Sequence, residues 1–375
     1  MNSNKKMVLG IVLAAMIYIH SYANTKTYHC PDTNSPLQDR ISWAEKNISK
    51  INLQSGCYIG YSIQKKMRKN SWMGCFHCDG FRRATLREVL NGVEIIDHDN
   101  DQETIIHSNM SRSDHDKDNP IVLKDVAILF QILSSQNQLK ETSKIKITNM
   151  DQHADLNEMP ILWLGQANQD ESLDLLMPLY SKIKHEDEKE DLIVAVSMHD
   201  QTERVISFLE DRLKSNEPEE IREDATFWLG QQNDKRALII LKKLIDSDQS
   251  MKVREKAVFA ISQMTMKEAE TILIDLAYHA KPDKIKKQAI FWLGQKASEK
   301  ATEALKDVVF NIDETELQEH AVFALSQQDN DFAVPQLIKI VKTHPNPEIR
   351  KKAIFWLGET GDPRVVDVLV DMVRK

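Results

Sequence analysis

A short block of apolar and small residues recurs along the second half of the chain. Each strong copy reads Phe-Trp-Leu-Gly, Phe-Ala-Ile-Ser or Phe-Ala-Leu-Ser, and a weaker copy ends at Ser197. The small residues that close the five strong copies are spaced 32 residues apart, at Gly230, Ser262, Gly294, Ser326 and Gly358. A repeat of this length accommodates two helices of about twelve residues and two short turns. The spacing therefore predicts a stack of about six helical hairpins.

The first helix of each predicted hairpin is apolar over most of its circumference. In the copy at 221–230, Ile221, Ala225, Trp228 and Leu229 fall on one arc at about 100° per residue. Such a helix needs cover from the repeats on both sides and from its own hairpin partner. The flanking Phe column is therefore expected to pack between repeats, with a ligand-binding strip as the alternative. This column holds Phe227, Phe259, Phe291, Phe323 and Phe355.

Two further columns support the hairpin. Trp and Ala alternate at 228, 260, 292, 324 and 356, which predicts interdigitated neighbours and a 64-residue pair of hairpins as the unit. In the second helix, Leu recurs eleven residues after each small residue, and an Ala or Val stands four residues before it. These positions predict the buried stripe of that helix. They are Leu241, Leu273, Leu305, Leu337 and Leu369, with Ala237, Ala269, Ala301, Ala333 and Val365.

The opposite face of the second helices is predicted to be exposed and varies from copy to copy. It carries both charge signs, which suits a protein surface better than a polyanion, and exposed aromatic residues are common anchors of protein interfaces. We therefore expect a partner to contact this face, although the two rings can instead pack against an adjacent repeat. The candidate contact residues are Lys243, Tyr278, Asp307, Phe310 and Lys339.

The 32-residue pattern resembles the short HEAT-type repeat seen in phycobilisome-lyase-like proteins. Its alternating form is similar to a group of exported bacterial HEAT-repeat proteins, and the resemblance covers roughly residues 167–375. It implies an α-solenoid. Among known proteins with such repeats, the enzymes that hydroxylate a modified lysine hold iron on several His-Glu pairs. This chain has one such dipeptide, His185-Glu186. The other activity that the resemblance suggests is attachment of a bilin, but no partner for that reaction is evident for an exported chain.

Residues 24–166 are predicted to form a smaller α+β domain. Leu37, Ile41, Ala44, Ile48 and Ile51 mark one face of a helix, and alternation over 58–64 indicates a strand. Segments 93–97 with 103–107, and 126–133 with 144–148, are expected to form two hairpins. Segment 109–119 is a polar loop. Residues 159–164 are predicted to be a strand, because Pro160 stands where a helix interior would be.

Residues 1–23 have the composition of a secretory signal. Lys5 and Lys6 precede an apolar run over 7–19, and Ser21 and Ala23 supply small residues before a cut after Ala23. The run is short for a bilayer span, so a permanent anchor is the less favoured alternative. The mature protein is therefore expected to be periplasmic or extracellular, with no membrane span.

All four cysteines, Cys30, Cys57, Cys75 and Cys78, precede the repeats. In an exported protein, an even and clustered set indicates disulfides first. Metal binding by the Cys-x2-Cys pair and free or redox-active thiols are the alternatives. The series Asp97, Asp99 and Asp101 lacks the later residues of a calcium loop, so a solvated turn is expected there.

The formal net charge is -8 and becomes about -10 once the two signal lysines are removed. This balance disfavours a nucleic-acid partner, which normally selects a basic face. We find no nucleophile elbow, phosphate loop or His-Glu-x-x-His motif, and expect no catalytic residue, metal ligand or cofactor. The sequence thus predicts an exported, non-enzymatic scaffold for a protein partner in the cell envelope or outside the cell. The alternative is a metal- or thiol-dependent redox or enzymatic module in the N-terminal domain, with the repeats as its docking arm.

Overall fold

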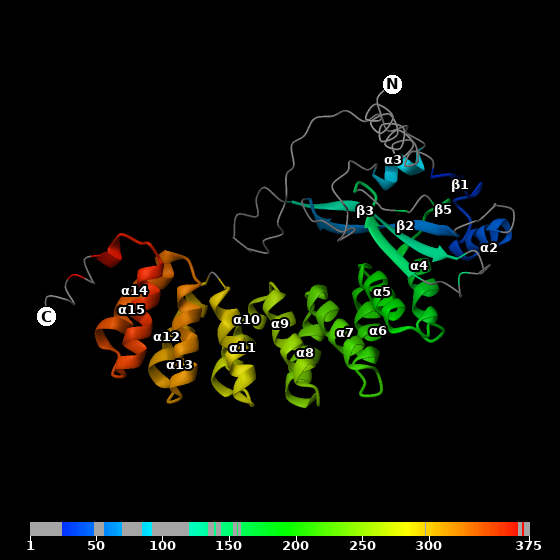
Figure 1. The fold of residues 1–375 in the computed structure, drawn as a ribbon. Coiled ribbons are helices and arrows are strands. Elements are labelled where there is room, and N and C mark those ends of the chain that lie inside the picture. The colour runs from blue at the N-terminus through cyan, green and yellow to red at the C-terminus, as the bar shows by residue number, and fades with distance from the viewer. Residues whose placement is uncertain are drawn as a thin grey trace, which may run out of the picture. The chain divides into compact units, whose positions relative to one another are not determined.

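The computed structural model describes residues 25–48, 56–69, 85–91, 120–133, 139, 144–152, 156, 159–296, 298–366 and 370. The expected signal segment, the hairpin over 93–107 with its Asp series, and the polar loop over 109–119 lie outside these residues, as do Ile51, Cys75, Cys78 and Leu369. The chain divides into two compact units, the first ending at Gln201 and the second beginning at Thr202 (Figure 1). Within the described ranges, no helix is long and apolar enough to cross a membrane.

The first unit is built on a mixed sheet of five strands in the order β1-β5-β2-β3-β4. β1 and β2 each pair in parallel with β5, whereas β3 pairs antiparallel with β2 and β4. The expected strand after Pro160 and the expected pairing of segments 126–133 and 144–148 are thereby confirmed. The strands are β1 (Thr27–His29), β2 (Cys57–Arg68), β3 (Ile121–Ile132), β4 (Lys144–Asn149) and β5 (Ile161–Gln166).

Helix α2 (Leu37–Ile48) follows β1 and precedes β2, and it packs on β5 and β2. Its predicted apolar positions Leu37, Ile41, Ala44 and Ile48 are all buried. Because β5 lies between β1 and β2 and runs parallel to both, the segment is a parallel crossover with a third strand inserted.

Strand β2 is buried on both faces. Its alternation led us to expect one buried face, but every residue from Cys57 to Ile63 is buried. The reason is that both faces have cover: Tyr58 packs in a core with Leu86 of α3 (Leu86–Leu90), and Tyr61 hydrogen-bonds to Ser172 of α4 (Gln169–Leu176). The alternation of residues along one strand does not show which distant segments cover its two faces.

The first unit extends past the sheet. Helix α4 packs on β2, and α5 (Glu186–Ser197) packs on β4, with the short helix η3 (Met177–Leu179) between them. The weaker repeat copy that ends at Ser197 is therefore a helix, and it belongs to the same compact unit as the sheet. The division between units falls after Gln201, later than the boundary at 166 that the start of the repeat-like pattern suggested.

The second unit is a stack of helical hairpins, coloured from green to red in Figure 1. Helix pairs follow one another at the predicted spacing, so the helical repeat is confirmed. The helices are α6 (Thr202–Arg212), α7 (Glu219–Gln232), α8 (Lys235–Ser247), α9 (Met251–Gln263), α10 (Lys267–His279), α11 (Asp283–Gly294), α12 (Glu299–Asn311), α13 (Thr315–Ser326), α14 (Asn330–Thr343) and α15 (Pro347–Glu359). We call α7, α9, α11, α13 and α15 the first helices, and α8, α10, α12 and α14 the second helices.

The columns predicted to be buried form the core of this stack. Ile221, Ala225 and Leu229 of α7 are fully buried, and so are their equivalents in each later first helix. In the second helices, the described Leu residues and the Ala residues four positions earlier are also fully buried, and Val365 is nearly so. Each fully buried Leu stabilises the stack by about 2 kcal/mol relative to exposure.

The small residues do more than mark the end of each first helix. Helix α7 continues past Gly230 to Gln232 and stops at Asn233, which has a left-handed backbone with φ of 50°. Gly230 instead allows α9 to approach, because a Cβ atom there would lie 2.8 Å from the Cβ atom of Ala260. The Gly and Ala positions of successive repeats therefore meet, and the small side chains allow the two helices to approach closely.

Candidate functional site

The face of the second helices predicted to be exposed is exposed in the structure. Lys243 of α8, Asp307 of α12 and Lys339 of α14 all reach solvent. So does Ile239 of α8, an apolar side chain that is 69 % exposed. The burial pattern thus agrees with the helical periodicity, and this face carries charges of both signs.

The two proposed aromatic anchors of that face are engaged by their neighbouring repeats. The Tyr278 hydroxyl donates a hydrogen bond to the Ala304 carbonyl oxygen at 3.1 Å, and burial raises the Tyr278 pKa to about 12. The Phe310 ring lies 5.2 Å from the His344 ring, with the Lys339 Nζ atom 6.0 Å from its centre. Both side chains are half-buried. Packing against the adjacent repeat, the alternative raised above, is what the structure shows for these rings.

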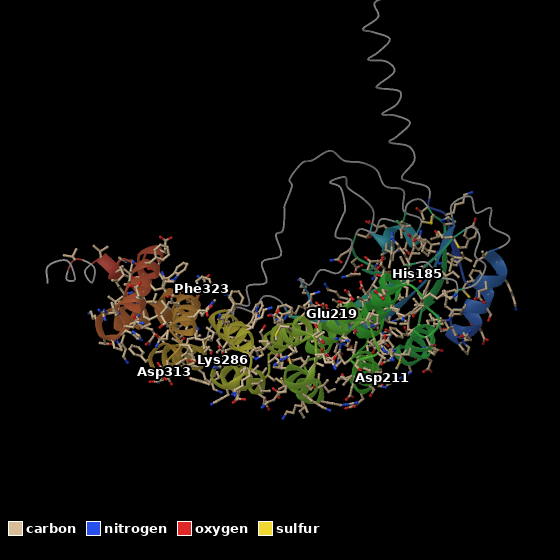
Figure 2. All side chains as sticks on the ribbon, turned by 60° about the horizontal axis from the view of Figure 1, so that its bottom comes forward. His185, Asp211, Glu219, Lys286, Asp313 and Phe323 are labelled. Atoms are coloured by element: carbon tan, nitrogen blue, oxygen red, sulfur yellow. The ribbon has the colours of Figure 1, made fainter. Side chains whose placement is uncertain are left out.

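A second aromatic surface runs along the first helices, and we call it the aromatic strip. Its rings contact one another from repeat to repeat: Phe227 stacks on Phe259 at 6.1 Å, and Phe259 lies 4.9 Å from Trp292. Figure 2 labels one member, Phe323 of α13, which lies 5.0 Å from Trp356. The strip consists of Phe227, Phe259, Phe291, Phe323 and Phe355 with Trp228, Trp292 and Trp356. The predicted packing between repeats is therefore confirmed for Phe227, Phe259 and Phe323.

The strip is nevertheless open to solvent at two of its rings. Phe259 and Phe323 are half-buried because a Trp of the next repeat covers each ring. Phe291 is followed by an Ala instead and is 38 % exposed, and Phe355 is 56 % exposed. Two aromatic rings two repeats apart are thus presented to solvent. Adjacent helix axes lie about 10 Å apart, so these rings are separated by about 20 Å.

Ion pairs between successive first helices border the strip. Lys252 contacts Glu219 at 2.9 Å and Lys284 contacts Glu255 at 2.7 Å, both across a repeat boundary. Lys287 pairs with Glu316 and Lys352 with Glu319 in the same way. Exposed pairs of this kind stabilise a fold little, because solvent and salt screen them. Their effect is to surround the aromatic rings with charges of both signs.

A hollow of about 380 Å³ opens on the strip between α13 and α15. Phe355 and Trp356 form its apolar wall, and its rim carries charged side chains of both signs. The Trp356 indole nitrogen is buried without a hydrogen-bond partner in the described structure, and so is that of Trp292. A hollow with an aromatic wall and a charged rim has the composition of an anchor pocket at a protein interface. The rim residues are Glu319, Glu348, Lys351 and Lys352.

Comparison with known protein families identifies the repeats. A model of HEAT repeats matches residues 206–294 and 302–375. These residues are HEAT repeats. No curated protein matches the chain.

The solved structures that are similar to the chain at low identity include the following two. Human deoxyhypusine hydroxylase in complex with glycerol is 21 % identical over 53 % of this chain and 81 % of its own, with a TM-score of 0.25. The complex of CpcE and CpcF of phycocyanin lyase from a Nostoc species is 14 % identical over 50 % of this chain and 82 % of its own, with a TM-score of 0.27. At these values, neither structure bears on what this chain binds or catalyses.

The described cysteines of the unit that precedes the HEAT repeats are free and buried. These are Cys30, next to β1, and Cys57, the first residue of β2. Desolvation raises the Cys57 pKa to about 12, so its thiolate is scarce at neutral pH and the thiol is a poor nucleophile or metal ligand. The expected disulfide and metal roles of Cys75 and Cys78 fall outside the described residues. Among the residues that are described, no cluster of three His, Cys, Asp or Glu side chains is placed to hold a metal.

A buried polar network in the first unit escaped the sequence analysis. The hydroxyls of Tyr61 and Ser172 lie 2.7 Å apart, and the His199 Nε2 atom lies 2.8 Å from the Ser172 hydroxyl. The His199 Nδ1 atom is 3.0 Å from the Val196 carbonyl oxygen, which fixes it as the donor. Nε2 then accepts from Ser172, and Ser172 accepts from Tyr61. All three side chains are buried, so the network joins β2, α4 and α5 rather than presenting a nucleophile. In the sequence, the only indication of this network is the presence of Tyr, Ser and His, and their separations match no known motif.

A polar hollow of about 640 Å³ lies at the end of β5 in the same unit, next to Gln64 of β2. Two of its lining side chains already bridge the surrounding structure: the Gln169 amide donates to the Gln64 carbonyl and accepts from the Asp200 backbone, each at 2.6 Å. The Asp200 carboxylate also pairs with Lys65 at 3.4 Å. These bonds tie α4 and the end of α5 to β2, so the wall of the hollow serves the packing of the unit.

Proposed function

We propose that this protein is an exported, non-catalytic scaffold that binds a protein partner along the aromatic strip of its HEAT repeats. The observation that carries the proposal is the exposure of Phe291 and Phe355 beside a hollow on the same face. Rings of this kind are the usual anchors of protein interfaces. The two rings of the second-helix face, our first candidate from the sequence, are occupied by neighbouring repeats. No Phe, Tyr or Trp ring in the described second helices is as exposed as Phe291 or Phe355.

The charge pattern supports a polypeptide partner over a polyanion. The strip is bordered by lysines and glutamates that alternate along the stack, and the whole chain is acidic at -8. A nucleic acid would meet repulsion from the glutamates, whereas a polypeptide with both charge signs can match them. A segment that spans the two exposed rings in an extended conformation needs about six residues for the separation of about 20 Å.

Binding is tested by capture from a cell-envelope extract with the full mature chain. We expect Phe291→Ser combined with Phe355→Ser to remove the captured partner without unfolding the protein, because both rings are partly exposed. Ile239→Ser is the matched control, since it removes an exposed apolar side chain from the other face. A second comparison uses Tyr278→Ser with Phe310→Ser. Loss of capture in that variant at an unchanged Tm, with the strip variant still binding, would transfer the site to the second helices.

Export is the second part of the proposal, and it is supported by the pattern of Lys5, Lys6 and the apolar run that follows. Sequencing the amino terminus of protein recovered from the cell envelope tests it. The expected new terminus is Asn24. Recovery of the protein in the cytosolic fraction with Met1 intact would contradict export while leaving the binding surface to its own test.

A further inference from the structure

Helix α15 repeats the sequence of α11 almost without change. Residues 285–294 and 349–358 agree at eight of ten positions, including Lys287 with Lys351, and Gly294 with Gly358. The two helices therefore present the same surface toward the repeat that follows. For α11 that surface is occupied in the structure, which shows what fits it.

Helix α13 covers this surface of α11. Ile290 is fully buried, and a Cβ atom on Gly294 would lie 2.6 Å from the Ala324 carbonyl oxygen. Lys287 forms an ion pair with Glu316, which stands eight residues before Ala324. We call the gap that the missing side chain leaves at Gly294, or at the equivalent Gly358, the glycine notch. The helix that fits this surface therefore has an Ala in the notch and, two turns earlier, a Glu that faces Lys287.

The same surface of α15 is open. Ile354 is only half-buried, and a Cβ atom on Gly358 would meet nothing within 4 Å. Lys351 is exposed, with no ion pair recorded among the described residues. Val366 is 61 % exposed, whereas Val334, its equivalent one repeat earlier, is fully buried. This surface of α15 is therefore apolar and uncovered in the described structure.

We infer that this open face of α15 is a docking site for a helical hairpin of another polypeptide, of the same kind as α13 with α14. Its first helix places an alanine in the Gly358 notch and a glutamate eight residues earlier against Lys351. The contact between α11 and α13 is the template: the same notch, the same lysine and the same isoleucine are satisfied there by these residue types. The site shares Lys351 with the rim of the hollow on the strip, but its notch at Gly358 lies outside the residues that line that hollow. The Gly358→Leu variant therefore tests it separately from the proposed strip function.

The inference is tested with the hairpin of this protein as the probe. A labelled peptide of residues 312–344 is titrated onto the full mature chain, and we expect saturable binding. Gly358→Leu should abolish it by filling the notch, without unfolding, since a Cβ atom there meets nothing within 4 Å beyond the adjoining backbone of its own helix. Lys351→Glu should weaken it, and a peptide that carries Glu316→Lys should restore binding to that variant. Equal binding by the Gly358→Leu variant overturns the inference.

A second measurement keeps the test decisive if the free peptide does not fold. Appending residues 312–344 directly after Lys375 continues the 32-residue spacing, so the added hairpin meets α15 in register. We expect the Tm to rise by about 4 °C, and the rise to vanish with Gly358→Leu. No rise in the extended chain, together with no peptide binding, rules the site out. A dimer of the unmodified protein that Gly358→Leu dissociates would overturn the assignment to a foreign hairpin and identify the occupant as a second copy.

Discussion

Gly294 of α11 lies against Ala324 of α13 so closely that a Cβ atom on residue 294 would be 2.6 Å from the Ala324 carbonyl oxygen and 2.9 Å from its Cβ atom. The same relationship joins Gly230 to Ala260 one pair of repeats earlier. Glycine within a helix normally costs about 1 kcal/mol relative to alanine. The close approach of the next helix is the physical reason for its presence here.

This relationship predicts opposite effects of one substitution at two equivalent sites. Gly294→Ala should destabilise the protein by about 1 to 3 kcal/mol, because the added methyl group meets backbone that cannot move away. Gly358→Ala should stabilise it by up to about 1 kcal/mol, because nothing lies within 4 Å and only helix propensity changes. Urea unfolding of both variants measures the difference. Equal effects at the two sites would mean that the packing of α11 on α13 is looser than described.

Trp292 packs between two repeats, and its removal should lower the free energy of unfolding. Its ring lies 4.9 Å from those of Phe259 and Phe291, and the side chain is half-buried. We expect Trp292→Ala to destabilise the protein by about 2 to 4 kcal/mol, since the small neighbours cannot refill the space. Ile239→Ala, at a site that is 69 % exposed, is the control and should change stability by less than about 0.5 kcal/mol. A Tm of the Trp292 variant within a degree of the control would show that the ring contributes to binding alone.

Ser172 links Tyr61 to His199 in the core of the first unit. Ser172→Ala should cost about 1 to 3 kcal/mol, because a buried hydroxyl and a buried ring nitrogen both lose their partner. Ser181→Ala is the matched control, since that hydroxyl is exposed and bonds only locally to the Pro178 carbonyl. Thermal unfolding compares the two, and equal Tm values would mean that water satisfies the network.

Stability should fall as the pH drops from 6.5 toward 4, because of His199. Burial lowers its folded-state pKa to about 4 from 6.5, so between these values the unfolded chain binds more protons than the folded chain. Full stability is therefore present above pH 6.5. About 3 kcal/mol is lost by pH 4. His199→Gln should flatten this part of the pH profile, measured as Tm in steps of pH.

Asp191 makes the opposite contribution. Burial raises the pKa of Asp191 from 3.8 to about 6, so between these values the folded chain binds more protons than the unfolded chain. The folded state therefore loses stability as the pH rises through this range. Asp191→Asn should raise stability at pH 7 by about 1 to 2 kcal/mol, after allowance for partial exposure. The gain should disappear below pH 4. A gain of equal size at every pH would point to a cause other than titration.

The sheet also limits how the cysteines can pair. β5 lies between β1 and β2, and the register His29 with Trp163 and Tyr58 with Ile161 sets Cys30 and Cys57 about four residues apart along the strands. Two strand spacings alone separate them by about 9.5 Å, beyond the roughly 7 Å that a disulfide spans. If the exported protein is oxidised, we expect mass spectrometry of its peptides to show Cys30 and Cys57 joined to Cys75 or Cys78, never to one another.

The sequence alone determined the repeat, its two helices and their buried columns. The 32-residue spacing placed every small residue, and helical periodicity identified Leu241 and Ala237 as core and Lys243 as surface, as the structure confirms. Pro160 was enough to assign β5 to a strand, although its residues fit the repeat pattern. These features depend on contacts within one helix or one hairpin, where spacing along the chain fixes which side chains share a face.

Only the tertiary structure decided which aromatic rings remain open. All five Phe residues occupy the same position of the repeat, yet Phe259 is half-buried and Phe291 is exposed. The ring that covers Phe259 belongs to Trp292 of the next first helix. The network of Ser172 and His199 and the open notch at Gly358 have the same origin. Burial at these sites depends on the side chain that another element places against them. The periodicity of a helix shows which of its residues share a face, but not the size of the residues that pack against that face.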